Sequence, residues 1–192
     1  YSYVKKLGDK AQTLVDLGHH LPNANIEQIV SLLLMENKLG GFHFNDSKYG
    51  DDDLTAGALK PYQLFLIFNE LVEGMDARGM NHAKDLGWMI DASHNIKDPL
   101  EDLLQSVEAI MIAYAQALSV DRKALEQAQE ENDVVKAQEI LQNAFRTDVR
   151  ALVAEARLRS GAALNPVALY RSLQVRENLI GERGLKTLAT GL

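Results

Sequence analysis

Cysteine is absent from the 192 residues of this chain. Disulfides and thiolate metal sites are therefore excluded, so any bound metal must be held by carboxylates and imidazoles. No apolar run reaches the length of a membrane span and no signal-peptide pattern opens the chain, so we expect a cytoplasmic protein with no membrane partner. Basic residues are outnumbered by acidic ones, 20 to 27, and the net charge of -7 argues against nucleic acid as a partner.

What the chain does contain is ordinary for a globular protein, with 46% hydrophobic and 24% charged residues. Its length is sufficient for one domain with a substantial core. The first residue is Tyr1 rather than methionine, so we expect a piece of a longer protein or a processed product.

Short apolar segments predict three strands, at residues 12–16, 41–45 and 86–91. Each predicted strand is followed by a helical pattern. This alternation implies a parallel sheet with right-handed crossovers, an α/β fold. Three parallel strands cannot close a barrel and would leave bare edges, so we expect further strands upstream of this chain.

Local signals mark where the helices begin and end. The chain opens on the last turns of a helix that Gly8 terminates. Asn25 is a suitable N-cap for the next helix, which we expect to stop at Gly40 and Gly41. Pro61 opens another, and the pair Asp98 and Pro99 marks the start of a helix that runs to about residue 120.

The composition changes at residue 121, after which we find no strand signal. Residues 121–132, 134–159 and 166–179 are predicted helices, and the mixed charges of the second suit a packing or oligomer-contact helix. We therefore divide the chain into an α/β part, residues 1–120, and a helical extension, residues 121–192.

Carboxylates and imidazoles gather where the predicted strands end. The end of a parallel strand is where α/β proteins place their chemistry, so these side chains are expected to converge. The candidate metal ligands are Asp16, His19, His43, Asp51, Asp53 and Asp91. Six ligands exceed what one octahedral ion takes from protein, and two ions that share a bridging carboxylate would use them all.

Each of these residues has a simpler explanation when it is taken alone. A single strand-end aspartate is more often a helix cap, and a single histidine is more often structural. Three coincidences at the same end of three strands favour the metal site. Asp52 is expected to point away from Asp51 and Asp53. Ser93, two residues after Asp91, could contact substrate or cap the turn, and the sequence leaves both open.

Three stretches of the chain, residues 15–22, 41–53 and 89–95, resemble bacterial L-rhamnose isomerases of the type with broad aldose-ketose specificity. The resemblance runs along most of the chain. It implies the last three βα units of a (β/α)8 TIM barrel followed by a helical extension, a homotetramer, and two divalent ions, often Mn²⁺. Mg²⁺, Co²⁺ and Zn²⁺ also accept carboxylate and imidazole ligands.

The resemblance also implies roles for the candidate residues. Asp16 would bridge the two ions. His43 and Asp91 would complete the substrate-coordinating ion. His19, Asp51 and Asp53 would hold the second, catalytic ion, and Asp53 would orient a water that relays a proton. This chain departs from the pattern of the family, because a glutamate ligand from an earlier strand does not occur in it.

The activity that the resemblance implies is the interconversion of L-rhamnose and L-rhamnulose, as a hydride shift or through an enediol. Two alternatives stay open at this point. One is a metal-dependent epimerase or hydrolase on the same kind of barrel. The other is a non-catalytic fragment, because the upstream glutamate is missing.

Overall fold

Three short parallel strands form the sheet of this protein, in the order β1-β2-β3. The structure is a computed structural model that describes residues 2–74, 86–92 and 97–184. The strands are β1 (Thr13–Asp16), β2 (Leu39–Phe44) and β3 (Gly87–Ile90), and both pairings are parallel. The predicted strands and the α/β class are therefore confirmed.

Helices connect and precede the strands as the local signals predicted. Helix α1 (Ser2–Lys6) comes before Gly8, whose φ of 87° lies in the left-handed region. Helix α2 (Ile26–Met35) begins after Asn25, whose side chain accepts a hydrogen bond from the backbone N–H of Gln28 at 2.9 Å. Helix α3 (Pro61–Val72) opens with its proline at the first turn.

The expected end of α2 at Gly40 and Gly41 is wrong. The helix stops at Met35, and Asn37 adopts a left-handed φ of 52°. The N–H groups of Asn37 and Lys38 then bond the carbonyls of Leu34 and Leu33, at 3.1 and 2.8 Å, and so close the last turn. The two glycines instead belong to β2, where a side chain on Gly41 would collide with the backbone of Gly87.

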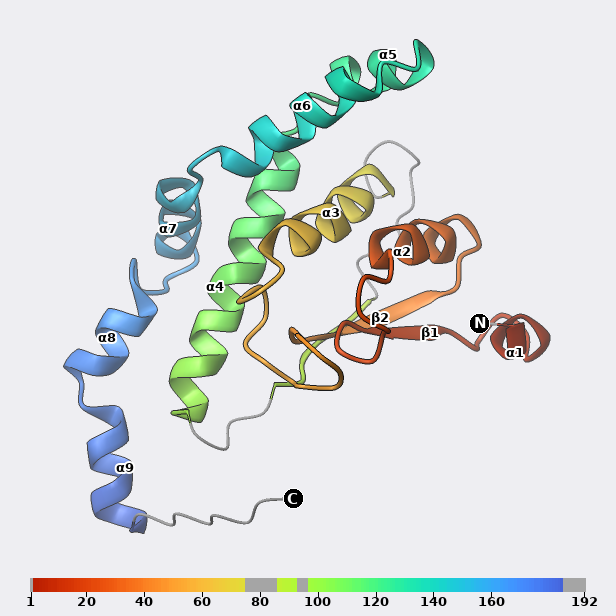
Figure 1. Cartoon of the computed structure of the whole chain (residues 1–192). Coiled ribbons are helices and arrows are strands. Elements are labelled where there is room, and N and C mark those ends of the chain that lie inside the picture. Colours follow the sequence, from red (N-terminus) through yellow and green to blue (C-terminus); the bar gives the residue numbers. More distant parts are fainter. Residues whose placement is uncertain (1, 75–85, 93–96, 185–192) are drawn as a thin grey trace.

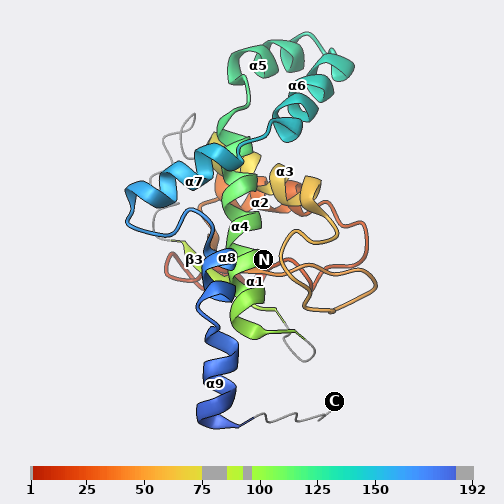
Figure 2. The same ribbon diagram turned by 90° about the vertical axis from the view of Figure 1, so that its left-hand side faces the viewer.

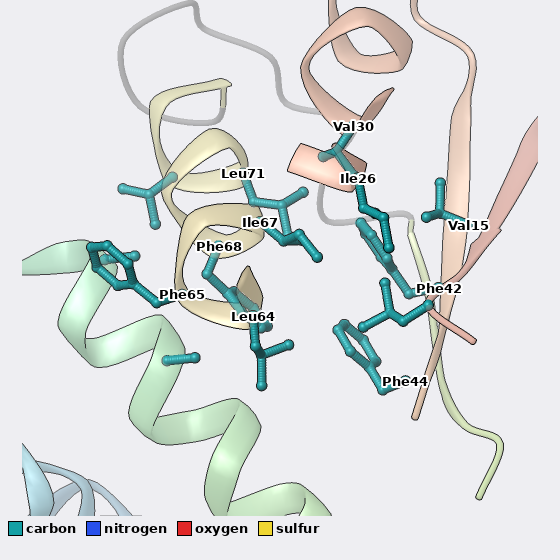
Figure 3. Close-up of a cluster of buried hydrophobic side chains, with 14 of the residues drawn as sticks. Val15, Ile26, Val30, Phe42, Phe44, Leu64, Phe65, Ile67, Phe68 and Leu71 are labelled. Carbon is teal, nitrogen blue, oxygen red and sulfur yellow. The ribbon is translucent and has the colours of Figure 1, made fainter. Parts of the chain in front are cut away.

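The main core lies between one face of the sheet and helices α2 and α3, as Figure 3 shows. Phe42 and Phe44 alternate with His43 along β2, so both rings point toward these helices. The ring of Phe44 stacks on Phe68 of α3 at 5.8 Å and on Trp88 of β3 at 5.7 Å between centroids. Burial of these rings fixes which face of each strand is turned away from the helices.

Helix α4 (Pro99–Leu118) packs beside α3, and the remaining helices follow it in the chain (Figure 1). Asp98 caps it as predicted, since its carboxylate accepts hydrogen bonds from the N–H groups of Leu100 and Glu101. Within the described residues, no single helix has the length and hydropathy to cross a membrane. The bent pair of α4 and α5 meets those two criteria together, with a 65° bend.

The rest of the described chain is helical, as predicted, but two of the expected helices are divided. The helices are α5 (Arg122–Glu130), α6 (Val134–Arg146), α7 (Arg150–Arg159), α8 (Pro166–Ser172) and α9 (Val175–Arg183). The predicted helix 134–159 breaks at Thr147, whose backbone is extended, and Asp148 bonds the N–H of Arg150. The predicted helix 166–179 breaks at Gln174, which has a left-handed φ of 49°.

These helices pack back onto the α/β part in two ways. Leu125 and Ala144, from α5 and α6, belong to the same buried cluster as the sheet. Farther along, α8 packs beside α4 and α9 continues past the N-terminal end of α4 (Figure 2). There the Tyr170 hydroxyl donates to Asp98 at 2.8 Å and Arg176 lies 3.1 Å from the same carboxylate. The division at residue 120 stays a prediction.

We expect Phe44→Ala to lower the free energy of unfolding of the full-length protein by about 3–5 kcal/mol, because Phe44 is only 1% exposed and its removal leaves a cavity. Urea denaturation followed by circular dichroism measures the change. Tyr3→Ala is the control, since Tyr3 is 81% exposed and its loss should cost less than about 0.5 kcal/mol. Equal losses in the two variants would contradict the assigned core.

A second prediction concerns pH. Burial opposes the ionisation of Asp98, but hydrogen bonds from Tyr170, Glu101 and Arg176 outweigh it and leave the pKa below the ordinary 3.8. The ionised carboxylate therefore stabilises the fold above pH 3.8, and this contribution is lost as the pH falls through the folded-state pKa. We expect Asp98→Asn, which keeps the cap, to cost about 1 kcal/mol at neutral pH.

The measurement is the free energy of unfolding of both proteins as the pH is lowered from about 7 to about 2. The difference between wild type and Asp98→Asn should shrink as the wild-type carboxylate becomes protonated. A difference that is constant over the whole range would show that the charge of Asp98 contributes nothing.

Candidate metal centre

The parallel register places Asp16, the last residue of β1, directly beside His43 of β2. On the next strand, Asp91 follows β3, and its N–H bonds the carbonyl of Phe44 at 3.1 Å. Since successive side chains of a strand point to opposite faces, His43 points away from the face that Phe42 and Phe44 turn toward α2 and α3. The three side chains meet at the carboxyl ends of the strands, where the sequence predicted them.

One imidazole nitrogen lies between two carboxylates. Nδ1 of His43 is 3.0 Å from Oδ2 of Asp16 and 2.9 Å from Oδ2 of Asp91. Donor atoms of these three residues all lie within 4.8 Å of one another. A ring nitrogen carries at most one hydrogen and can satisfy one carboxylate oxygen at a time. A divalent cation bound by the imidazole nitrogen and the two carboxylates would satisfy all three side chains at once, so the residues fit such an ion.

The loops after β1 and β2 bring the other candidate ligands to the same place. Nε2 of His19 lies 3.8 Å from Oδ2 of Asp16 and 3.2 Å from Oδ2 of Asp51. Beside His19 and Asp51, a surface hollow of about 400 Å³ is completed by Tyr49 and Leu21. A hollow of that size can hold a small polar ligand.

Two further aspartates hold the loop that carries Asp51 and Asp53. Asp46 is buried, and its carboxylate accepts hydrogen bonds from the backbone N–H groups of Ser47, Leu59 and Lys60, so it joins the two ends of the loop just before α3. The carboxylate of Asp52 accepts from the N–H groups of residues 48–50. It is therefore engaged with its own turn, in accord with the expectation that it faces away from its two neighbours.

Opposite pKa shifts distinguish two of the candidate ligands. Burial opposes ionisation of Asp16, but hydrogen bonds from Asn45, Gly18 and His43 outweigh it and lower the pKa of its carboxyl. For Asp53, burial and then the negative charges of Asp51 and Asp91 raise the pKa. The mutual repulsion of these carboxylates is what a pair of cations would relieve.

Sequence reasoning missed Asn45, whose side-chain amide donates to Asp16 at 3.0 Å and to Asp53 at 3.3 Å. The signal was present, because Asn45 follows His43 by two residues and so shares its side of the strand. It also missed the backbone N–H of Gly18, which bonds Oδ1 of Asp16 at 3.0 Å. The predicted residue Ser93 lies outside the described residues.

Fold and site together define an α/β protein with a candidate centre for divalent metal ions. The chain matches no family model. Along its full length it is homologous to a "probable sugar isomerase" of Mesorhizobium japonicum, with 53% identity over 193 residues that cover 100% of this chain and 44% of the relative. A "probable sugar isomerase" of Rhizobium meliloti is 55% identical over 183 residues, which cover 95% of this chain and 42% of the relative. The chain thus spans less than half the length of the curated relatives it matches.

We expect Asp91→Ala to weaken Mn²⁺ binding by more than about tenfold, because losing even an outer partner of a metal site costs that much. Isothermal titration of the full-length protein measures the affinity. Asp121→Asn is the control, since Asp121 caps α5 far along the chain and asparagine caps equally well. Equal affinity in Asp91→Ala and Asp121→Asn would remove Asp91 from the centre.

Proposed function

We propose that this chain supplies metal ligands to a sugar isomerase that interconverts L-rhamnose and L-rhamnulose. One observation carries the proposal: side chains from three parallel strand ends converge with their donor atoms within 4.8 Å, in a chain homologous to proteins named as probable sugar isomerases. The choice of rhamnose rests on the resemblance of the strand-end motifs to L-rhamnose isomerases.

Two divalent ions, Mn²⁺ in first place and Mg²⁺, Co²⁺ or Zn²⁺ as alternatives, would supply Lewis-acid polarisation of the sugar carbonyl and lower the pKa of water. Asp16 would hold both ions, since its Oδ2 lies near His43 and His19 at once. His43 and Asp91 would serve the ion that orients the sugar. His19 and Asp51, in contact at 3.2 Å, would serve the second ion together with Asp53.

We assign Asp53 the catalytic role. Its carboxylate accepts a hydrogen bond from Asn45 at 3.3 Å and lies among the candidate ligands of the second ion. A group of that kind can orient the water that carries a proton between the sugar oxygens O1 and O2. The surface hollow lined by His19 and Asp51 gives a small polar ligand access to these two candidate ligands of the second ion.

The larger architecture belongs to the same proposal. The three parallel strands, with the helices that cover one face of the sheet, would form three consecutive units of a (β/α)8 barrel. The helical extension would contribute to a homotetramer, through α6 and α7 in particular. We place the whole protein in the cytoplasm, with the sugar as its small-molecule partner.

The proposal is tested by measuring the conversion of L-rhamnose to L-rhamnulose by the full-length protein. After stripping with a chelator we expect no turnover, and Mn²⁺ should restore the formation of L-rhamnulose, seen as a ketose by chromatography. An epimerase would instead return another aldose. Activity that survives exhaustive removal of metal would end the proposal.

We further expect Asp53→Asn to lower kcat about a hundredfold or more, the usual cost of losing an acid-base group. Metal content, measured by mass spectrometry, should stay at two ions in the variant, because asparagine keeps a side-chain oxygen that can bind a divalent ion. The neutral control is again Asp121→Asn. If turnover is unchanged while both ions are bound, Asp53 does not have the assigned role.

A further inference from the structure

Asn45 is the most buried polar side chain at the metal centre, with 2% of its surface exposed. Its amide nitrogen donates two hydrogen bonds, to Oδ1 of Asp16 at 3.0 Å and to Oδ1 of Asp53 at 3.3 Å. An amide nitrogen carries two hydrogens, so both are used. Asn45 therefore joins Asp16, at the end of β1, to Asp53, on the loop after β2, and neither residue is adjacent to Asn45 in the sequence.

The orientation of this amide is fixed by chemistry. Both of its neighbours are carboxylates, which accept hydrogen bonds and do not donate them when ionised. Rotating the amide would turn its oxygen toward two negative groups. The oxygen instead points into the protein, where within the described part of the chain it has no hydrogen-bond partner. A buried hydrogen-bond acceptor without a partner lowers the stability of the fold. We therefore take the two N–H donors of Asn45 to be the functional part of this side chain.

Close packing leaves the amide little room to move. A side-chain carbon at Gly18 would lie 3.2 Å from both the nitrogen and the oxygen of the Asn45 amide. Gly18 also donates its backbone N–H to Asp16 Oδ1 at 3.0 Å. The absence of a side chain at residue 18 thus allows backbone and amide to bond the same carboxylate oxygen.

This arrangement divides the two oxygens of Asp16. Oδ1 accepts from Gly18 and Asn45, whereas Oδ2 faces the ring nitrogens of His43 and His19. On the other side, Asp53 sits on a backbone with φ of 47°, which a non-glycine residue rarely adopts. The bond from Asn45 holds this residue toward Asp16 against the repulsion between their charges.

We propose that Asn45 is a positioning residue that holds Asp16 and Asp53 so that one oxygen of each remains free for the pair of cations. The inference rests on the proposed function, since it needs the two-ion centre. Asn45 touches the ligands and neither the ions nor the sugar, so it acts through Asp16 and Asp53. Partners of this kind around metal ligands control affinity as well as geometry.

The test compares Asn45→Ala and Asn45→Ser with wild type in the full-length protein. The measurements are Mn²⁺ affinity by isothermal titration and the electron paramagnetic resonance spectrum of the bound Mn²⁺, in which two neighbouring ions are magnetically coupled. We expect Asn45→Ala to weaken binding about 10- to 100-fold and to lose the coupled signal at concentrations where wild type shows it. Asn45→Ser keeps one donor, and we expect a smaller loss.

The matched control is Asn69→Ala. Asn69 is a buried asparagine on α3, 4% exposed, whose side-chain oxygen accepts from Arg122. Its loss should lower thermal stability and leave Mn²⁺ affinity and the coupled spectrum unchanged. If Asn45 had only a structural role, Asn45→Ala would behave like Asn69→Ala, with lower thermal stability but unchanged Mn²⁺ affinity and an unchanged coupled spectrum.

The outcomes separate this inference from the function on which it rests. If wild type binds two Mn²⁺ ions and isomerises L-rhamnose while Asn45→Ala and Asn45→Ser bind as tightly as wild type, the positioning role is wrong and the function stands. If wild type itself binds no Mn²⁺, the proposed function fails and the inference falls with it. Should Asn45→Ala not fold, Asn45→Ser decides by the same comparison with Asn69→Ala.

Discussion

The parallel pairing of β1 with β2 and of β2 with β3 is the constraint on which the site depends. Side chains of a strand alternate between two faces, so burial of Phe42 and Phe44 against α2 and α3 sends His43 to the opposite face. The register then sets Asp16 beside His43. A slip of one residue would bury the imidazole and expose the rings, so the packing of the hydrophobic core also fixes the geometry of the candidate metal centre.

That geometry brings several negatively charged aspartates together, while other aspartates of the same region bind the backbone of the loop. Burial first, and then the negative charges of Asp51 and Asp91, raise the pKa of Asp53. Asp46 and Asp52 take no part in this cluster and instead bind backbone N–H groups of the loop. In one acidic stretch, some carboxylates thus shape the loop and others face the centre, which residue type alone does not distinguish.

Much of the α/β part could be predicted from the sequence, because its signals are local. Asn25, Pro61 and Asp98 start helices through contacts with their own first turns, and short apolar runs mark the strands. The errors also have local causes. Asn37, rather than Gly40, ended α2, and Gln174 divided a predicted helix, since both adopt left-handed backbones that residues other than glycine seldom use. The role of Asn45 was not predicted, because its partners Asp16 and Asp53 are distant in the sequence and only the fold brings them together.

Three residues of the candidate metal centre depart from general rules of stability. Asp53 has a left-handed backbone, the oxygen of Asn45 is buried without a partner among the described residues, and His43 lies between two carboxylates that it cannot satisfy together. A sequence selected for stability alone would remove such conflicts, because each is open to single substitutions. The conflict at His43 is the one that a cation between the two carboxylates would offset, which supports the proposed metal centre.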